Sequence, residues 1–158
     1  MRDDDFERLY AAEAPGLFSF LAYRTGDRAL AQDLLADAFE KALRARRGYD
    51  RRRGSEKTWL YAIALNVLRD HLRRAAAESR AYERVEDGAA RDPFADVEVR
   101  DELMRGLTQL SAEEREAISL RFGAGLTVPE MATVLGEPLT TVEGRVYRAL
   151  RKLREALA

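Results

Sequence analysis

The sequence contains no cysteine and only one histidine among its 158 residues. Without cysteine the chain forms no disulfide, no zinc–thiolate site and no cysteine nucleophile. With His71 alone, a Ser-His-Asp relay or a multi-histidine metal site is hard to build, and a surface position in a basic helix is the plainer interpretation. The phosphate-binding motifs GxGxxG and GxxxxGK[ST] are missing as well. We therefore expect a protein that is not an enzyme and needs neither metal nor cofactor.

Long apolar runs are also absent. The longest, WLYAIALNVL at residues 59–68, is interrupted by Asn66, and it is much shorter than the roughly 18 residues that a membrane span needs. The N-terminal MRDDDFERLY is acidic and lacks the apolar core of a signal peptide. These absences predict a cytoplasmic protein without membrane association.

Charged residues, by contrast, are abundant and nearly balanced. They make up 35% of the chain, apolar residues make up 46%, and the net charge is −1. A charged fraction above the roughly 25% of average domains suits a thin, helical protein with much surface. Because the net charge is close to zero, any surface that binds nucleic acid must be local.

Apolar residues recur at three- and four-residue spacing, and no segment shows sustained two-residue alternation, so the sequence predicts an all-α fold. Pro15 should separate the first two helices, and Asp27 and Ser55 are candidate N-caps of later ones. We expect helices at about 4–13, 16–25, 28–46, 56–82, 97–109, 112–123, 128–135 and 140–156.

Charge divides the chain into three parts. Residues 1–74 carry 15 Lys/Arg and 12 Asp/Glu, a net of +3; residues 75–102 carry 4 and 9, a net of −5; residues 103–158 carry 8 and 7, a net of +1. The middle part has few large apolar residues and contains Asp87-Gly88 and Pro93. It is typical of a mobile acidic linker between two small helical domains.

The C-terminal part has the pattern of a helix-turn-helix. Capping boxes begin at Ser111 and Thr127, and Gly136 ends a short helix before a tight turn. In the next helix an apolar stripe faces inward, and the opposite face would lie toward a DNA major groove. That face carries Thr141, Gly144, Arg148 and Arg151. An αα-hairpin with a solvated basic face remains the alternative.

Glu143 stands near the start of this second helix. The run Thr140-Thr-Val-Glu143 has the form of a capping box, which predicts that Glu143 is structural. Base reading then falls to Thr141, Arg145, Tyr147 and Arg148, with Gly144 allowing close approach to the bases.

The N-terminal part contains a cluster of basic residues. Residues 41–57 contain eight basic residues and two acidic ones. Tyr49, Trp59 and Tyr61 lie beside them, and basic residues next to aromatics suit binding of single-stranded nucleic acid. A core position for Trp59 and a solvated turn at residues 51–53 are the alternatives. The helix that follows should bury Trp59, Leu60, Ile63 and Val67, and it should expose Asn66, Arg69, Asp70, Arg73 and Arg74.

These segments together resemble one family. The N-terminal part contains AQDLLADAFEKAL followed by GSEKTWLYAIALNVLRDHLRR, and the C-terminal part contains LTQLSAEEREAISLRFGAGLTVPEMATVLGEPLTTVEGRVYRALRKLR. In this order and spacing they closely resemble the extracytoplasmic-function (ECF) group of bacterial sigma factors. The resemblance implies a region 2-like domain at 1–74, an acidic linker at 75–102 and a region 4-like domain at 103–158.

The resemblance also implies partners and sites. The partners are the RNA polymerase core, through its β′ clamp helices and β flap, promoter DNA, and an anti-sigma factor. Polymerase binding would use Asp33, Asp37 and Phe39, with Ala36 where the family usually has Gln. Asn66 and the loop from Tyr49 to Lys57 match positions that read single-stranded promoter DNA. The DNA-binding residues would be Arg51, Arg52, Arg53, Lys57, Asn66, Arg69, Arg73, Arg74, Thr140, Thr141, Gly144, Arg145, Tyr147 and Arg148.

Two other functions remain open at this stage. The chain could be a helix-turn-helix regulator that acts without polymerase, although that function gives no reason for the basic loop beside TWLYAIALN. It could also be a sigma-like protein that binds polymerase without initiating transcription, which Ala36 and Glu143 allow, because the family usually has Gln at the first position and Lys or Arg at the second.

Overall fold

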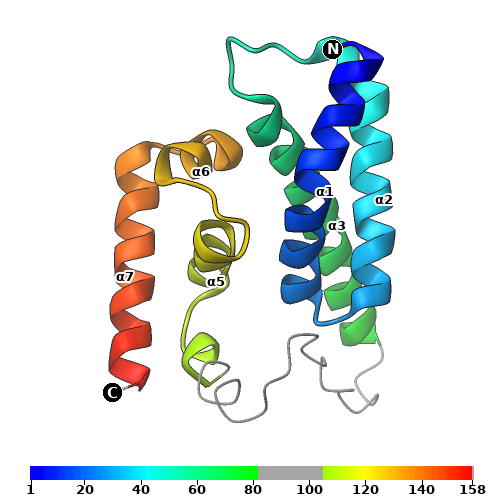
Figure 1. Ribbon diagram of the computed structural model, residues 1–158. Helices are drawn as coiled ribbons and strands as arrows, with labels where there is room; N and C mark the ends of the chain where they lie inside the picture. The colour runs from blue at the N-terminus through cyan, green and yellow to red at the C-terminus, as the bar shows by residue number, and fades with distance from the viewer. Residues whose placement is uncertain (82–104, 158) are drawn as a thin grey trace. The chain divides into compact units, whose positions relative to one another are not determined.

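The computed structural model describes residues 1–81 and 105–157, and the regular secondary structure of these two stretches is helical throughout (Figure 1). The predicted all-α fold is confirmed. The stretches belong to two compact units, here named the N-terminal unit (1–81) and the C-terminal unit (105–157). Residues 75–81, which the charge pattern assigns to the linker, continue the last helix of the N-terminal unit. The rest of the predicted linker and most of the predicted helix at 97–109 lie outside the described residues.

The first helix, α1 (Asp3–Thr25), runs through Pro15 without a break, so the prediction of two helices separated there is wrong. Proline lacks the N–H that a helix interior uses and usually kinks or ends a helix. Leu9 is buried before the proline, and Leu17 and Leu21 are buried after it. Packing of this one apolar face against α2 and α3 therefore outweighs the local cost of the proline.

The second helix, α2 (Arg28–Ala45), begins at the predicted cap. The Asp27 carboxylate accepts a hydrogen bond from the backbone N–H of Leu30 at 3.1 Å. Its inner face is largely alanine, since Ala31, Ala38 and Ala42 are fully buried. Side chains this small bring helix axes close together, so α2 packs tightly between its two neighbours.

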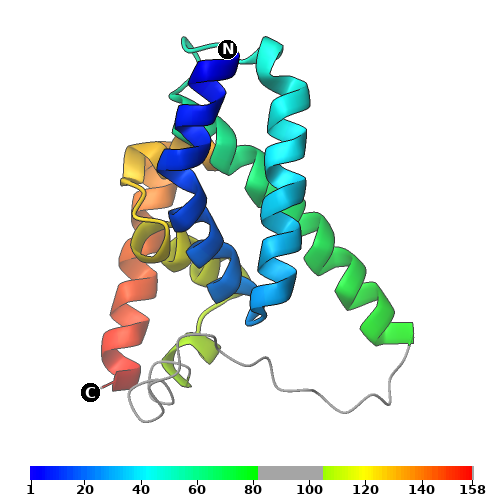
Figure 2. The same ribbon diagram turned by 45° about the vertical axis from the view of Figure 1, so that its right-hand side comes forward.

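The third helix, α3 (Glu56–Ala81), starts at the predicted cap Ser55, whose hydroxyl accepts from the backbone N–H of Thr58 at 3.1 Å. Leu60, Leu65 and Leu68 are buried on its inner side. Figure 2 shows α3 running obliquely across α1 and α2. The three helices thus enclose one apolar core.

The C-terminal unit is built from shorter elements. They are α5 (Ala112–Ile118), the π-helical turn η2 (Ser119–Gly123), α6 (Val128–Leu135) and α7 (Leu139–Leu157). Both predicted capping boxes are present: the hydroxyl of Ser111 accepts from the N–H of Glu114 at 3.1 Å, and that of Thr127 accepts from the N–H of Glu130 at 3.2 Å. The helix expected at 112–123 instead widens into η2 after Ile118.

The turn between α6 and α7 sets where α7 begins. Gly136 ends α6 with φ of 64°, a conformation that favours glycine. The carbonyl of Pro138 then accepts from the N–H groups of Thr141 and Val142 at 3.1 and 3.2 Å. The helix therefore starts at Leu139, and Thr140 lies inside its first turn. The predicted capping box between Thr140 and Glu143 is wrong, because neither side chain makes a hydrogen bond within the described residues.

The core of the C-terminal unit is built around α7, which packs against α5 and α6. A Cβ built on Gly106 would approach Cδ2 of Leu153 to 3.1 Å, so the segment before α5 lies close against α7. The apolar stripe predicted for α7 is buried as expected. The core consists of Leu107, Leu110, Ala117, Ile118, Leu120, Leu126, Met131, Val134, Val142, Val146, Ala149 and Leu153.

Candidate nucleic-acid and polymerase interfaces

The exposed face of α7 gathers five of the predicted DNA-binding residues. Thr140, Thr141, Tyr147 and Arg148 are exposed, and Gly144 lies half-buried among them. Tyr147 is 65% exposed, which is unusual for an aromatic side chain with no packing role. The face, here named the outer face of α7, therefore offers hydroxyl, guanidinium and aromatic groups to a ligand on one side of a rigid helix.

Arg145 does not belong to the outer face. Its guanidinium donates to the carboxylate of Glu137, with Nη1–Oε1 at 3.3 Å and Nη2–Oε2 at 2.6 Å, and Oε2 of Glu113 lies 3.9 Å from Nη2. The Arg145 side chain is only 13% exposed. The hydrogen bonds that Arg145 donates to Glu137 raise the pKa of Arg145 above its usual range, against the opposing effect of burial. This predicted base reader is therefore held inside the unit.

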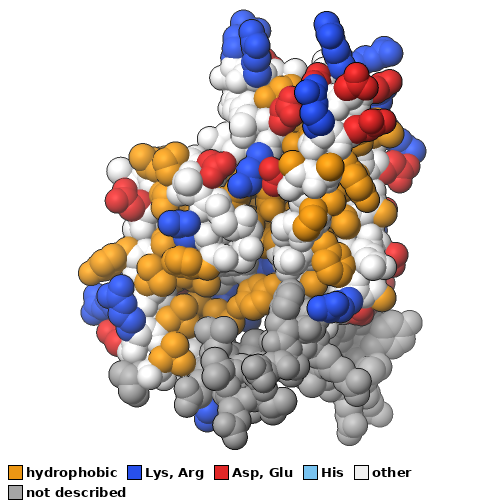
Figure 3. Space-filling view, viewed as in Figure 1, with side chains coloured by type: hydrophobic (Ala, Val, Ile, Leu, Met, Phe, Trp, Pro, Cys, Tyr) orange, Lys and Arg blue, Asp and Glu red, His pale blue; other side chains and the backbone are white. Residues whose placement is uncertain are grey.

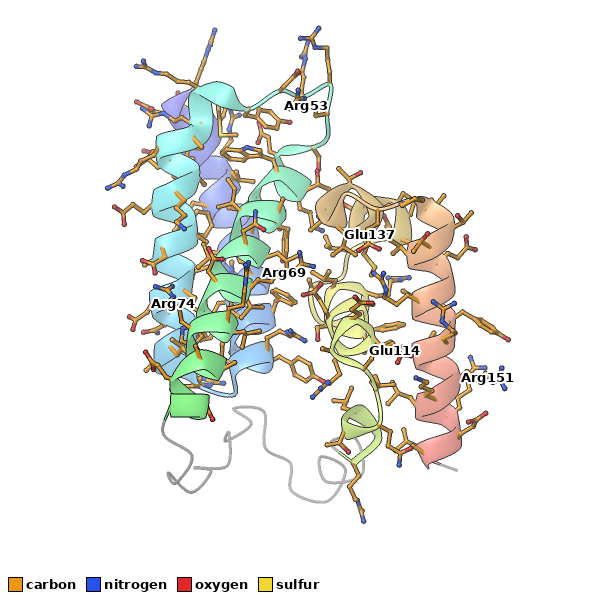
Figure 4. All side chains as sticks on the ribbon, turned by 180° about the vertical axis from the view of Figure 1, so that it is seen from behind. Arg53, Arg69, Arg74, Glu114, Glu137 and Arg151 are labelled. Atoms are coloured by element: carbon orange, nitrogen blue, oxygen red, sulfur yellow. The ribbon has the colours of Figure 1, made fainter. Side chains whose placement is uncertain are left out.

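A second ion pair joins α7 to α5. Nζ of Lys152 lies 2.6 Å from Oε1 of Glu114, whose side chain is 9% exposed. The hydrogen bond from Lys152 lowers the pKa of Glu114 below its usual range, although burial alone would raise it. Figure 4 shows Glu114 lying between the two helices. The sequence identified Glu114 only as a capping residue, because a partner 38 residues away leaves no local signal.

The five basic residues of α7 thus have different surroundings. Arg145 is paired and largely buried, Lys152 is paired although its side chain is 48% exposed, and Arg148 and Arg154 are exposed. Arg151 points outward (Figure 4) and pairs with Glu155 at 3.4 Å, where both side chains are about 70% exposed. An exposed pair of this kind holds its partners weakly. Three cations, Arg148, Arg151 and Arg154, can therefore bind a ligand without breaking an ion pair that joins α7 to another part of the unit.

The basic loop between α2 and α3 has a defined shape. After the single turn η1 (Arg46–Gly48), the hydroxyl of Tyr49 donates to the carbonyl of Gly54 at 2.9 Å. The carboxylate of Asp50 accepts from both the backbone N–H and Nε of Arg52, at 3.0 and 3.2 Å. These bonds close the loop at its base and present Arg51, Arg52 and Arg53 to solvent. Figure 3 shows basic side chains gathered at this end of the N-terminal unit, and Figure 4 labels Arg53 at the loop.

Only two of the three predicted aromatics lie beside this loop. The rings of Tyr49 and Trp59 meet edge to face, with centroids 5.4 Å apart, and both side chains are half-buried. Tyr61 is 1% exposed and packs against Phe20 with centroids 6.2 Å apart. The prediction that Tyr61 contributes to a stacking surface is therefore wrong, because position 61 faces the core of the three-helix unit.

The remaining predicted DNA-binding residues of this unit follow α3. They extend from Lys57 to Arg74, a distance of about 25 Å at 1.5 Å per residue. Asn66 is exposed, whereas Arg69 is half-buried and is not without an interaction partner. Asp70 accepts from Arg73 through its carboxylate, at 3.0 Å, and from Arg74 through its carbonyl, at 3.4 Å. Figure 4 shows Arg69 and Arg74 along α3.

The predicted polymerase-binding residues divide between surface and core. Asp33 and Asp37 lie one turn apart on the exposed side of α2, and neither has an ion-pair partner within the described residues. Phe39 is 6% exposed and packs against Phe6 and Tyr10, with ring centroids 6.2 and 4.6 Å away. Phe39 therefore does not form part of the exposed face, because its position on α2 points toward α1.

Two kinds of site are missing from residues 1–81 and 105–157. No three His, Cys, Asp or Glu side chains there lie close enough together to hold a metal ion. No helix among them combines the length and apolar character required to cross a membrane.

Comparison with known families assigns both units. Residues 9–78 match Sigma-70 region 2, and residues 100–153 match Sigma-70, region 4. The chain is 35% identical to the RNA polymerase sigma factor CarQ of Myxococcus xanthus, over 98% of this chain and 90% of CarQ. It is 27% identical to the ECF RNA polymerase sigma factor BldN of Streptomyces coelicolor, over 98% of this chain but 61% of BldN.

Two solved structures are similar over most of the chain. One is the sigma factor RpoE of Bartonella quintana in complex with the anti-sigma factor NepR, with a TM-score of 0.77, 26% identity, and coverage of 97% of this chain and 96% of RpoE. The other is CnrH in complex with the cytosolic domain of CnrY, with a TM-score of 0.71, 28% identity, and coverage of 99% and 89%. With region 2 and region 4 both matched in order, the chain belongs to the ECF group of the sigma-70 family and is a sigma factor that directs RNA polymerase to promoters.

Proposed function

We propose that this sigma factor divides promoter recognition between its two units, with the basic loop and α3 binding the single strand of the downstream element and α7 reading the upstream duplex. This division is supported by one observation: the two units present chemically different surfaces, the basic loop and the outer face of α7. The loop combines three exposed arginines with the half-buried Tyr49–Trp59 pair, whereas the outer face of α7 has a helix-turn-helix geometry. Such proteins act without chemistry of their own, and we place this activity in the cytoplasm.

Strand opening then follows from preferential binding. Unstacking a base costs a few kcal/mol. Stacking on an aromatic side chain returns about 1–3 kcal/mol per base, and arginine contacts to phosphates add to this. The hydrogen bonds that close the loop at Tyr49 and Asp50 reduce the entropy lost when DNA binds. Replacing Arg51, Arg52 and Arg53 with Ala should therefore leave closed-complex binding largely intact and reduce permanganate reactivity of unpaired promoter thymines.

The exposed carboxylates of α2 are the proposed contact with the polymerase core. Asp33 and Asp37 have no partner within the described part of the chain, so they are available to basic residues of the β′ clamp helices. Asp37→Arg should weaken core binding by more than about 1 kcal/mol, the value of an exposed pair, because the interface excludes water. Unchanged affinity in a polymerase titration would contradict this contact.

Run-off transcription tests the whole proposal. Core polymerase with this chain should initiate on specific genomic fragments, and core polymerase alone should not. Polymerase binding without transcripts would favour a sigma-like protein that does not initiate. Binding to DNA fragments without polymerase would favour an independent helix-turn-helix regulator.

An anti-sigma factor is the proposed inhibitor. One of the similar structures contains a sigma factor bound to an anti-sigma factor, and the other contains CnrH bound to the cytosolic domain of CnrY. We propose that the inhibitor of this chain covers the Asp33–Asp37 face of α2, so that it competes with polymerase. Competition of the purified inhibitor with core polymerase for the wild-type chain, lost in Asp37→Arg, is the expected result.

A further inference from the structure

The ion pair between Glu137 and Arg145 has a role that family resemblance does not assign. We infer that Arg145 is a positioning residue that fixes the orientation of α7 through Glu137, and that it does not read bases itself. The inference rests on the proposed reading of upstream DNA by α7. It transfers sequence reading to the outer face of α7 and gives the turn before α7 a part in recognition.

The pair connects two points that decide how α7 is held. Glu137 directly follows Gly136, the residue at which α6 ends, and Arg145 lies two turns into α7. Two guanidinium nitrogens of Arg145 face the two carboxylate oxygens of Glu137. A two-point contact of this kind fixes direction as well as distance. The turn is thereby tied to the body of the helix that it introduces.

The guanidinium of Arg145 has no free pair of hydrogen-bond donors for a base. A guanine would need two parallel donors on its O6 and N7, and Glu137 already occupies both terminal nitrogens of Arg145. The carboxylate of Glu113 stands 3.9 Å from one of them, and 13% of the side chain is exposed. To reach DNA, Arg145 would have to leave Glu137 without its partner. Arg148, which is exposed, has no such cost.

A second ion pair, between Lys152 and Glu114, lies on the same side of α7 as Arg145. Positions 145 and 152 are seven residues apart and therefore share one side of the helix. Their acidic partners on α5, Glu113 and Glu114, are adjacent. This side of α7 thus faces the first turn of α5, and its two cations hold the helix in place. The outer face adjoins this side of the helix, since Thr141 and Arg148 lie four residues before and three residues after Arg145, and it remains exposed to a ligand.

Glu137→Gln separates positioning from reading by the sign of its effect. The variant should be measured as the full chain bound to core polymerase, on a pool of duplex DNA randomised in the upstream element. If Arg145 positions α7, Glu137→Gln weakens binding to the selected sequences by about tenfold, within the range of typical couplings between sites, and base preference stays the same. If Arg145 reads a base, the loss of its carboxylate partner releases it, and binding stays equal or tightens.

Glu143→Gln is the matched control. It also removes one negative charge from the helix-turn-helix, but Glu143 has no partner within the described residues. We expect binding at least as tight as wild type and no change in base preference. A gain in both Gln variants would overturn the inference, because only the lost charge would then matter.

Two further variants complete the test. Arg145→Ala should weaken binding as Glu137→Gln does, and the double variant should be no weaker than either single one, because one pair is removed in all three. A changed preference at one base pair in Arg145→Ala overturns the inference and leaves the proposed function intact. Arg148→Ala should change preference at one base pair. If it changes neither affinity nor preference, upstream reading by α7 fails, and the inference fails with it.

Discussion

The two units are stabilised in different ways. The N-terminal unit has helices of 23, 18 and 26 residues, a core composed mainly of leucine and alanine, and ion pairs such as Arg44–Glu40 that join neighbours on one exposed helix surface. In the C-terminal unit α5 and α6 have 7 and 8 residues. There the ion pairs Glu114–Lys152 and Glu137–Arg145 join α7 to α5 and to the turn before α7, and one partner of each pair is largely buried, with Glu114 at 9% and Arg145 at 13% exposure.

The difference shows what each unit requires of its charged residues. Isolated helices shorter than about 12 residues are marginal in water, so α5 and α6 depend on their capping boxes and on contacts with α7. In the N-terminal unit apolar packing is sufficient, and the exposed charges are left available for partners. Charged residues therefore support the fold in one unit and mainly serve function in the other.

The largest effect should come from the apolar core of the N-terminal unit. Leu17 is fully buried, and Leu17→Ala should lower the free energy of unfolding of this unit by about 3 kcal/mol, from lost burial and the cavity that remains. Trp59 is the only tryptophan of the chain, so its fluorescence follows this unit alone. The matched variant Leu126→Ala, in the other core, should leave the fluorescence midpoint unchanged. A shift of that midpoint would mean that the two units unfold together.

The next largest effect should come from the pair between α5 and α7. Lys152→Ala leaves the buried carboxylate of Glu114 without its cation, and it should destabilise the C-terminal unit by about 2 kcal/mol. In denaturant unfolding of the full chain, circular dichroism should show a transition of the C-terminal unit at lower denaturant concentration, while the midpoint of the Trp59 fluorescence transition is unchanged. The exposed pair Arg151–Glu155 provides the control, because Arg151→Ala removes a cation of the same helix and should cost less than about 0.5 kcal/mol.

The same pair predicts a dependence on pH. The folded pKa of Glu114 lies below its ordinary value of 4.5, so the pair stabilises the fold above that pH. This contribution is lost as the pH falls from 4.5 through the lower, folded pKa. The loss should be smaller in Lys152→Ala. An acid transition of the C-terminal unit that is identical in wild type and variant would contradict the assignment.

A smaller effect should come from the cap of α6. Thr127→Ala removes the hydroxyl that accepts from the N–H of Glu130, and it should cost about 1 kcal/mol in the C-terminal unit. Thr127→Ser keeps the hydroxyl and should restore most of the stability. Equal loss in both variants would show that the methyl group of Thr127 matters and the cap does not.

The smallest effect should come from an exposed ion pair of the N-terminal unit. Arg73→Ala removes the pair with Asp70. The free energy of unfolding of this unit, followed by Trp59 fluorescence, should change by less than about 0.5 kcal/mol. The same variant should weaken binding of single-stranded promoter DNA. A stability loss above 1 kcal/mol would show that charge supports both units alike.

Local signals in the sequence predicted much of this structure. The caps at Asp27, Ser55, Ser111 and Thr127 each lie where the helix begins, because the hydrogen bonds of a cap involve residues only two or three positions away. Helical periodicity likewise located α2, α3 and α6. The start of α7 was missed by one residue, because the turn that fixes it uses the carbonyl of Pro138 and no side chain.

The other errors come from contact between residues distant in the sequence. Pro15 is accommodated because both sides of it pack on α2 and α3, and Tyr61 and Phe39 are buried by aromatic neighbours from α1. For the candidate site, residue types and spacing identified the outer face of α7 and the basic loop. They did not distinguish Arg145 from Arg148, since only the fold brings Glu137 and Glu113 to one of them.

Arg145 and Lys152 are each paired with a carboxylate of the same unit, and this pairing affects how DNA binding depends on salt concentration. Each phosphate neutralised on duplex DNA releases condensed counterions. A plot of the logarithm of the binding constant against the logarithm of salt concentration therefore has a slope of about −0.9 per phosphate contact. Five free cations on α7 would give a slope of about −4.5, whereas the three left by pairing give about −2.7. Upstream recognition by this sigma factor should therefore depend less on ionic strength, and more on contacts with base edges, than the basic sequence of its last helix indicates.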